Sequence, residues 1–185
     1  MALTPSSMVS LGSTAPYFEL QNTIDDKNYT LLSLKGEDAT VVFFICNHCP
    51  YVVHIAEAIA SLAAEFQKVG VRFIAISSND IVAQPDDSPE NMRLFAAKYG
   101  FDFPYLYDPT QAVAKAYDAA CTPDLYVYDK DLTLKYRGQF DNSRPGNQTP
   151  ATGNDLRAAL EAILVGEEPN KLQRPSIGCN IKWKD

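Results

Sequence analysis

Apolar residues form a continuous run at residues 39–45 and then a stripe with helical spacing. The run is rich in β-branched and aromatic residues, which predicts a strand covered on both faces. Such a stripe at steps of three and four is typical of an amphipathic helix, and Gly70 is placed to end it. The stripe consists of Val52, Ile55, Ile59, Leu62, Phe66 and Val69.

The rest of the chain continues this alternation of strands and helices. Ser88 and Pro89 are typical of a helix start, and Gly100 is typical of its end. The order predicts an α/β sandwich of three layers, with a central mixed sheet, helices on both faces and an N-terminal hairpin. Further strands are expected at residues 16–20, 29–34, 71–78, 103–107, 125–129 and 132–140, and helices at 88–100, 108–117 (capped by Asp108) and 156–164.

Length and composition indicate one ordinary globular domain. The chain has 185 residues, of which 46% are hydrophobic and 21% charged, so we expect a single domain over 1–185 with its core at about 16–166 and a tail at 167–185. A net charge of −7 argues against nucleic acid or an anionic membrane as a partner. The sequence shows neither a basic leader nor a long apolar run, which predicts a cytoplasmic protein. No cofactor is expected.

The chemistry of the chain centres on Cys46 and Cys49, a C-x-x-C pair at the junction of the predicted strand and the long helix. His48 lies between the two cysteines, and Pro50 follows them. Backbone N–H groups at a helix N-terminus favour a thiolate, and such cysteines can titrate as low as about 3.5–7.5. We expect Cys46 to be the attacking thiol, nearer the surface, and Cys49 to be the more buried resolving thiol. A protonated His48 would lower the pKa of Cys46 further.

Cysteines with this spacing are also found in zinc sites and in inert buried pairs. Four tetrahedral ligands would require a second C-x-x-C or C-x-x-H, and the sequence has neither. A redox dithiol is therefore favoured. A zinc or copper site formed by Cys46, Cys49 and Cys121 stays as an alternative.

Two motifs give the chain a resemblance to a known family. The run "ATVVFFICNHCP" before the long helix, and "CTPD" before the strand "LYVYD", resemble the thioredoxin fold. With the opening segment "APYFELQNTIDDKNYTLLSLKG", the chain more closely resembles the alkyl hydroperoxide reductase/thiol-specific antioxidant (AhpC/TSA) branch over about residues 16–166. The resemblance implies a cis Thr122–Pro123 bond and leaves the backbone of Thr122 free to pair with an extended substrate strand.

The same resemblance bears on the reaction. The peroxidatic cysteine of peroxiredoxins aligns with Cys49, but Val42 and Cys46 stand where that family carries a proline and a hydroxyl residue. This implies a thiol–disulfide oxidoreductase acting on protein or small-molecule disulfides with a thiol reductant system. An antioxidant enzyme that reduces hydroperoxides is the alternative, and both a monomer and a homodimer fit.

The two remaining cysteines and one arginine complete the set of expectations. Cys121 should lie in the loop facing Cys46, either extending the relay or serving as a small buried residue. Cys179 is a candidate resolving thiol, although an incidental thiol in a docked tail is favoured. Arg137 is expected to face solvent.

Overall fold

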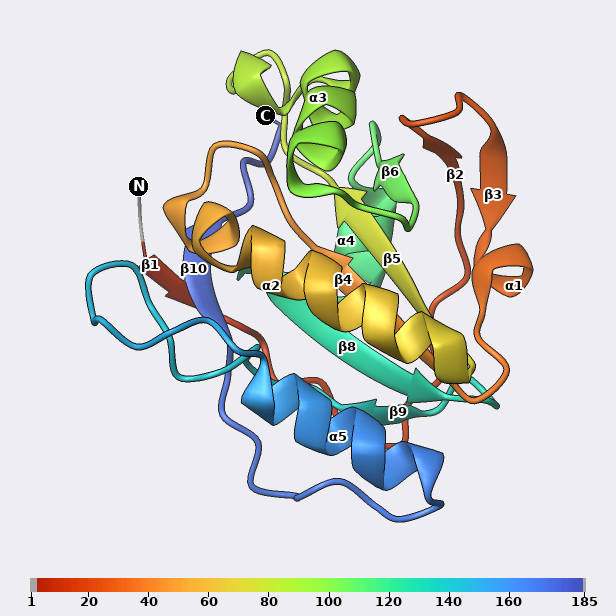
Figure 1. Cartoon of the computed structure of the whole chain (residues 1–185). Helices are drawn as coiled ribbons and strands as arrows, with labels where there is room; N and C mark the ends of the chain where they lie inside the picture. Colours follow the sequence, from red (N-terminus) through yellow and green to blue (C-terminus); the bar gives the residue numbers. More distant parts are fainter. Residues whose placement is uncertain (1–2, 185) are drawn as a thin grey trace.

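A seven-stranded sheet forms the centre of the computed structural model, which describes residues 3–184 (Figure 1). β4 (Ala39–Phe44) lies inside it, parallel to β5 (Val71–Ser77) and antiparallel to β8 (Asp124–Asp129). The full order is β3-β2-β6-β5-β4-β8-β9, so the sheet is mixed, as the sequence predicts. The other strands of this sheet are β2 (Glu19–Asn22), β3 (Asn28–Thr30), β6 (Tyr105–Tyr107) and β9 (Leu134–Tyr136).

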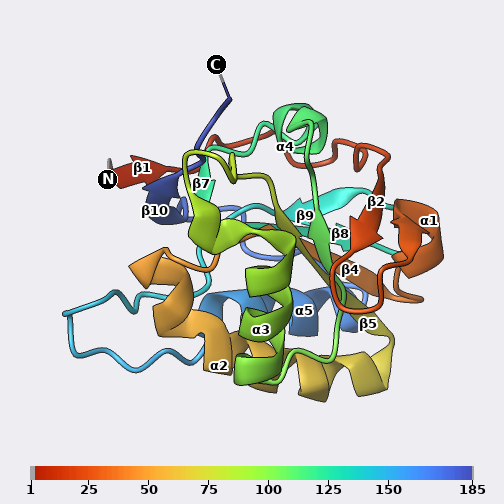
Figure 2. The ribbon, with the colours of Figure 1, turned by 90° about the horizontal axis from the view of Figure 1, so that it is seen from above.

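Helices cover both faces of this sheet (Figure 2). One layer contains α2 (Pro50–Phe66), α3 (Pro89–Tyr99) and α5 (Asn154–Leu164), and the other contains α1 (Leu31–Leu34) and α4 (Ala112–Ala116). Short 3₁₀ turns occur at η1 (Gln67–Val69) and η2 (Pro85–Asp87). The predicted three-layer α/β architecture is confirmed. Within residues 3–184, no helix has both the length and the apolar character needed to cross a membrane.

β4 joins the two hydrophobic cores because successive strand residues point to opposite faces. Val41 and Phe43 pack in the core beneath α2, whereas Val42 and Phe44 pack in the core beneath α4. All six residues of β4 are buried, as expected for a strand covered on both sides. Each fully buried side chain of this size contributes about 1.5–3 kcal/mol. The end of β4 and the start of α2 are thus held firmly in place.

A separate three-stranded sheet ties the two ends of the chain together. β10 (Ile177–Asn180) lies between β1 (Leu3–Pro5) and β7 (Cys121–Thr122), antiparallel to both. In Figure 1, β1 and β10 run side by side beyond the N-terminal end of α2. The tail at 167–185 therefore contributes the central strand of a sheet, which its sequence did not predict.

Two local predictions were wrong because side chains favoured other conformations. Residues 31–34 form α1 instead of extending a strand, since Thr30 and Ser33 make a reciprocal capping box. The helix expected from 108 begins only at Ala112, with Gln111 at its N-cap. Asp108 instead accepts hydrogen bonds from Ser78 Oγ (2.9 Å) and from the N–H of Ala114 (3.0 Å).

Arg137, which was expected to face solvent, is fully buried beside Asp124. The two side chains form an ion pair, and each is 0% exposed. The guanidinium also lies 4.0 Å from the ring centre of Tyr126 and donates to Leu125 O. Asp124 accepts further hydrogen bonds from Ser6 Oγ and from the N–H of Ala120. This pair therefore joins β8 to the segments that precede β7 and follow β1.

Replacing Arg137 with methionine should lower the free energy of unfolding by about 3–5 kcal/mol, because it leaves the Asp124 carboxylate buried without a counter-charge. Urea denaturation measures the change. The matched control is Arg93→Met, which removes an ion pair with Asp26 whose side chains are 49% and 66% exposed, together with a hydrogen bond to the carbonyl oxygen of Thr23. That loss should be about 1 kcal/mol or less. Equal effects of the two substitutions would contradict the assigned role of the buried pair.

Candidate active site

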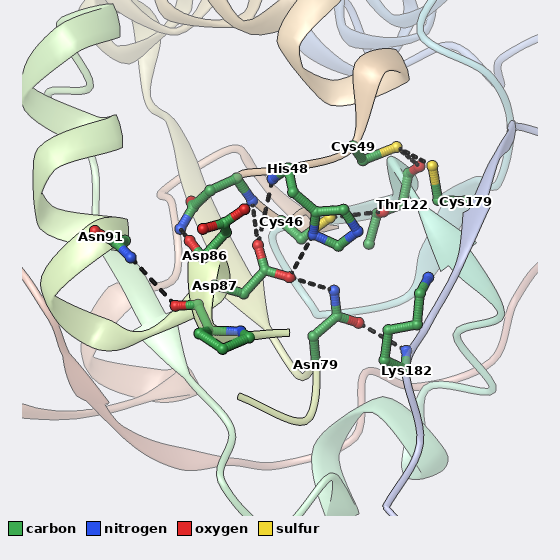
Figure 3. A network of polar contacts seen from close by, with 12 residues as sticks. Cys46, His48, Cys49, Asn79, Asp86, Asp87, Asn91, Thr122, Cys179 and Lys182 are labelled. Carbon is green, nitrogen blue, oxygen red and sulfur yellow. Dashed lines mark hydrogen bonds and ion pairs between the residues drawn. The ribbon is translucent and has the colours of Figure 1, made fainter. Parts of the chain in front are cut away.

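The loop between β4 and α2 carries both cysteines of the C-x-x-C pair, and the helix starts later than expected. α2 begins at Pro50, and Cys49 is its N-cap. Cys46 lies three residues earlier, outside the helix. Opposite this loop, the Thr122–Pro123 peptide bond is cis, as the resemblance implied. Figure 3 shows the side chains that gather here.

Cys49 is the thiol that the helix start stabilises as an anion. The anionic form of its sulfur is stabilised by hydrogen bonds from the thiols of Cys46 and Cys179 and from the N–H of Val52 in the first turn of α2. The bond from Cys46 has the largest effect, and together these donors outweigh burial and lower the pKa of Cys49 to about 5. These donors favour the anionic form of the Cys49 sulfur.

Cys46 has the opposite character. Its pKa is raised well above the ordinary value, first because its thiol donates to Cys49, then because of burial and the negative charge of Asp87. A contact of 3.2 Å with Thr122 Oγ1 opposes this only in part. The expectation of a low pKa at Cys46 was therefore wrong, because the helix N-terminus is at Cys49. Cys46 is also no nearer the surface, since both residues are 0% exposed.

His48 is held by Asp87, a fully buried residue at the end of η2. His48 Nδ1 lies 2.7 Å from Asp87 Oδ2, and the histidine side chain is 9% exposed. Asp87 also accepts hydrogen bonds from the N–H of Asn47 (2.7 Å) and from Asn79 Nδ2 (2.7 Å). Burial alone would raise the pKa of Asp87, but these hydrogen bonds keep it below the ordinary value. Cys46 therefore lies near a buried carboxylate, which opposes the effect expected of a protonated His48.

Asp87 was missed in the sequence because it lies 38 positions after Cys49 in a polar loop that gives no catalytic pattern. Together with Cys46 and His48 it forms the one group of potential metal ligands within residues 3–184, with donor atoms within 4.8 Å of one another. Cys49 and Cys121 do not belong to this group. The set expected for zinc or copper is therefore not assembled among the described residues.

Cys121 is buried beside the dithiol but contacts other partners. Its sulfur lies 3.9 Å from Ser6 Oγ and 3.6 Å from the carbonyl oxygen of Pro123. Burial raises the pKa of this thiol far above its usual range. The residue that faces Cys46 from this loop is Thr122. The surroundings of Cys121 are those of a small buried side chain.

Cys179 lies directly against the dithiol, a contact that the docked-tail interpretation did not anticipate. Its sulfur is 2.7 Å from the sulfur of Cys49, and none of the four cysteines is in a disulfide. The same Cys49 sulfur is 3.2 Å from the carbonyl oxygen of Thr122. Burial and the hydrogen bond to Cys49 raise the pKa of Cys179 to about 12. Three sulfurs, from Cys46, Cys49 and Cys179, therefore share one buried site.

Titrating the reduced protein by its thiolate absorbance near 240 nm should give a midpoint near 5 that belongs to Cys49. Cys49→Ser should abolish this step, and Cys46→Ala should move it to higher pH by removing the leading hydrogen-bond donor. Cys121→Ala serves as the control and should leave the midpoint unchanged. A step that survives in Cys49→Ser but vanishes in Cys46→Ser would assign the thiolate to Cys46 instead.

Comparisons of sequence place the chain among thiol-dependent oxidoreductases. The AhpC/TSA family matches residues 11–137. Peroxiredoxin Q of Gentiana triflora is 27% identical over 150 residues, and the match covers 76% of this chain but 65% of that protein. The thiol-disulfide oxidoreductase ResA of Geobacillus thermodenitrificans is 28% identical over 138 residues, covering 71% of each chain.

A comparison of structures extends the likeness over the whole chain. The crystal structure of a conserved protein from Geobacillus kaustophilus is 53% identical, has a TM-score of 0.97 and covers 100% of this chain and 97% of that one. A secreted disulfide oxidoreductase of Mycobacterium tuberculosis, at 20% identity and a TM-score of 0.60, shares the fold. The family match covers more than half of the sequence. The chain therefore belongs to the AhpC/TSA family, a group of oxidoreductases within the thioredoxin-like superfamily.

Proposed function

We propose that this protein is a thiol–disulfide oxidoreductase that uses Cys46 and Cys49 as its dithiol–disulfide couple, with Cys49 as the attacking thiol. The supporting observation is the low-pKa sulfur of Cys49 at the start of α2, with the Cys46 thiol as its hydrogen-bond donor. A thiolate is the reactive form of cysteine, and this arrangement supplies one at neutral pH. The roles assigned from the sequence to the two cysteines are thereby exchanged.

The reaction proceeds by two exchanges at sulfur. The Cys49 thiolate attacks one sulfur of a substrate disulfide, forms a mixed disulfide and releases the other substrate sulfur as a thiolate. Cys46 then loses its proton and attacks the Cys49 sulfur, which forms the Cys46–Cys49 disulfide and releases the second substrate thiolate. The His48–Asp87 pair is the titratable group near Cys46 and is placed to receive that proton. Two electrons pass from the protein to the substrate.

A thiol reductant restores the dithiol by the reverse exchange. The substrates in this proposal are protein or small-molecule disulfides, bound beside Thr122 and Pro123. ResA, among the relatives, carries the name thiol-disulfide oxidoreductase. The proposal treats the chain as one domain acting in the cytoplasm, because four cysteines in 185 residues are few compared with a disulfide-stapled secreted protein.

Hydroperoxide reduction is the second candidate, favoured by the position of Cys49. The resemblance found in the sequence implies that this cysteine corresponds to the peroxidatic residue of the family, and several relatives are named peroxiredoxin Q. A peroxide oxygen would be attacked by the Cys49 thiolate, giving a sulfenic acid that a second thiol converts to a disulfide with loss of water. Val42 and Cys46 in place of the proline and hydroxyl residue argue for the disulfide reaction instead.

The primary proposal predicts a defined product when the reduced protein reacts with glutathione disulfide. In a Cys179→Ser background, which removes the third sulfur, mass spectrometry should find the Cys46–Cys49 disulfide and two released glutathione thiols. Adding Cys46→Ser should stop the reaction at a glutathione adduct on Cys49. Adding Cys49→Ser should prevent both products, and adding Cys121→Ser is the control that should preserve them. Absence of the Cys46–Cys49 disulfide would reject the proposed couple.

The peroxidase candidate predicts fast single-turnover oxidation of Cys49 by hydrogen peroxide. Stopped-flow measurement of thiolate loss near 240 nm gives the second-order rate constant, and Cys49→Ser is the blank. A rate no greater than that of free cysteine at the same thiolate fraction would exclude this candidate while leaving the disulfide reaction untouched.

A further inference from the structure

The backbone of Thr122, expected to be free for a substrate strand, is already paired with the tail of the same chain. β10 lies antiparallel to β7 with Cys179 opposite Thr122 and Asn180 opposite Cys121. An unpaired strand edge beside a reactive group is a natural place for an extended peptide to add. Here that place is filled by residues 177–180.

β10 fits this position closely and is fastened on both sides. A Cβ atom on Gly178 would lie 1.9 Å from the carbonyl oxygen of Thr122 and 2.6 Å from its carbonyl carbon. Ser176 Oγ, just before the strand, donates to the carbonyl oxygen of Pro123 at 2.7 Å. On the other side, Leu3 of β1 lies opposite Cys179. The close approach of β10 to the cis-proline loop therefore depends on glycine at 178.

The position of the Cys179 sulfur is that of a disulfide partner. It lies 2.7 Å from Cys49 Sγ, beyond the roughly 2.05 Å of a covalent S–S bond. Cys49 is 0% exposed and Cys179 is 4% exposed. Both cysteines are therefore shielded from solvent while β10 stays in place.

We propose that β10 occupies the place of a substrate strand. An extended, cysteine-bearing segment must displace β10 to reach Cys49. As long as β10 is in place, Cys179 exchanges disulfides with Cys49. This inference rests on the proposed thiol–disulfide function. A displacing segment meets the same carbonyl oxygen of Thr122, so a glycine directly before its cysteine is favoured, as in Gly178–Cys179.

The internal exchange balances without another reactant. Starting from the Cys46–Cys49 disulfide, the sulfur of Cys179 attacks the sulfur of Cys49. The Cys49–Cys179 bond forms, the Cys46–Cys49 bond breaks, and the electron pair leaves with Cys46. Cys46 takes up the proton that Cys179 gives up. The number of disulfides is unchanged, and Cys46 becomes a free thiol.

Gly178→Ala tests the displacement, because the added methyl group must push β10 away from Thr122. Overpacking of this kind destabilises the docked strand, so alkylation of Cys49 by iodoacetamide in the reduced full-length protein should become about tenfold faster or more. The control is Gly36→Ala, whose Cβ would meet the carbonyl oxygens of Ala39 (2.0 Å) and Gly70 (2.7 Å) far from the site. Equal rates in Gly178→Ala and in either the wild type or Gly36→Ala would overturn the proposal.

Disulfide mapping tests the exchange without relying on a variant at Gly178. After oxidation by diamide, Cys46→Ser should hold a Cys49–Cys179 disulfide. The wild-type protein should be a mixture of molecules, some with this bond and the others with Cys46–Cys49. A free Cys179 in oxidised Cys46→Ser would refute the exchange. The proposed function is tested separately, by formation of the Cys46–Cys49 disulfide in the Cys179→Ser background. Failure of the exchange can therefore be distinguished from failure of the function.

Discussion

The start of α2 at Cys49 is the constraint on which the site depends. A buried anion is costly unless donors surround it, and the N-cap position provides the N–H of Val52 together with the thiols of Cys46 and Cys179. The helix is held in place by its apolar stripe against β4, so the donors have a fixed geometry before any substrate arrives. The N-terminus of α2 thus links the packing of the core to the charge of the Cys49 sulfur.

Two neighbouring thiols acquire opposite properties from this arrangement. Donors lower the pKa of Cys49, while the hydrogen bond to Cys49, burial and the carboxylate of Asp87 raise that of Cys46. Separated pKa values in a pair of titratable groups are typical of divided chemical roles. Such a division suits Cys49 as the nucleophile that attacks the substrate and Cys46 as the thiol that reacts after the mixed disulfide has formed.

The sequence could predict those parts of the fold and the site that are local. The apolar run of β4, the stripe of α2 and the cysteine pair lie within one continuous segment, so their periodicity and spacing were sufficient. The cis bond before Pro123 was predicted only through the family resemblance. The exact helix start was not predictable, because moving it by three residues leaves the apolar stripe unchanged but decides whether Cys46 or Cys49 is the N-cap.

Three residues owe their positions to contacts with parts of the chain that are distant in sequence. Cys179 arrives through pairing of β10 with β7, and Asp87 arrives through the loop before α3. Arg137 is charged, and only its buried partner Asp124 explains why it lies inside the protein. Each of these placements depends on a tertiary contact that no local pattern reports.

Asn79 gives the tail a physical connection to the acid beside Cys46 (Figure 3). Its Oδ1 accepts from the N–H of Lys182, two residues after β10, while its Nδ2 donates to Asp87 Oδ2. Turning the amide over would set donor against donor and acceptor against acceptor at both ends, so this side chain has one favourable orientation. The backbone that follows β10 thus helps to fix the amide that donates to Asp87, which links Lys182 to the carboxylate beside Cys46.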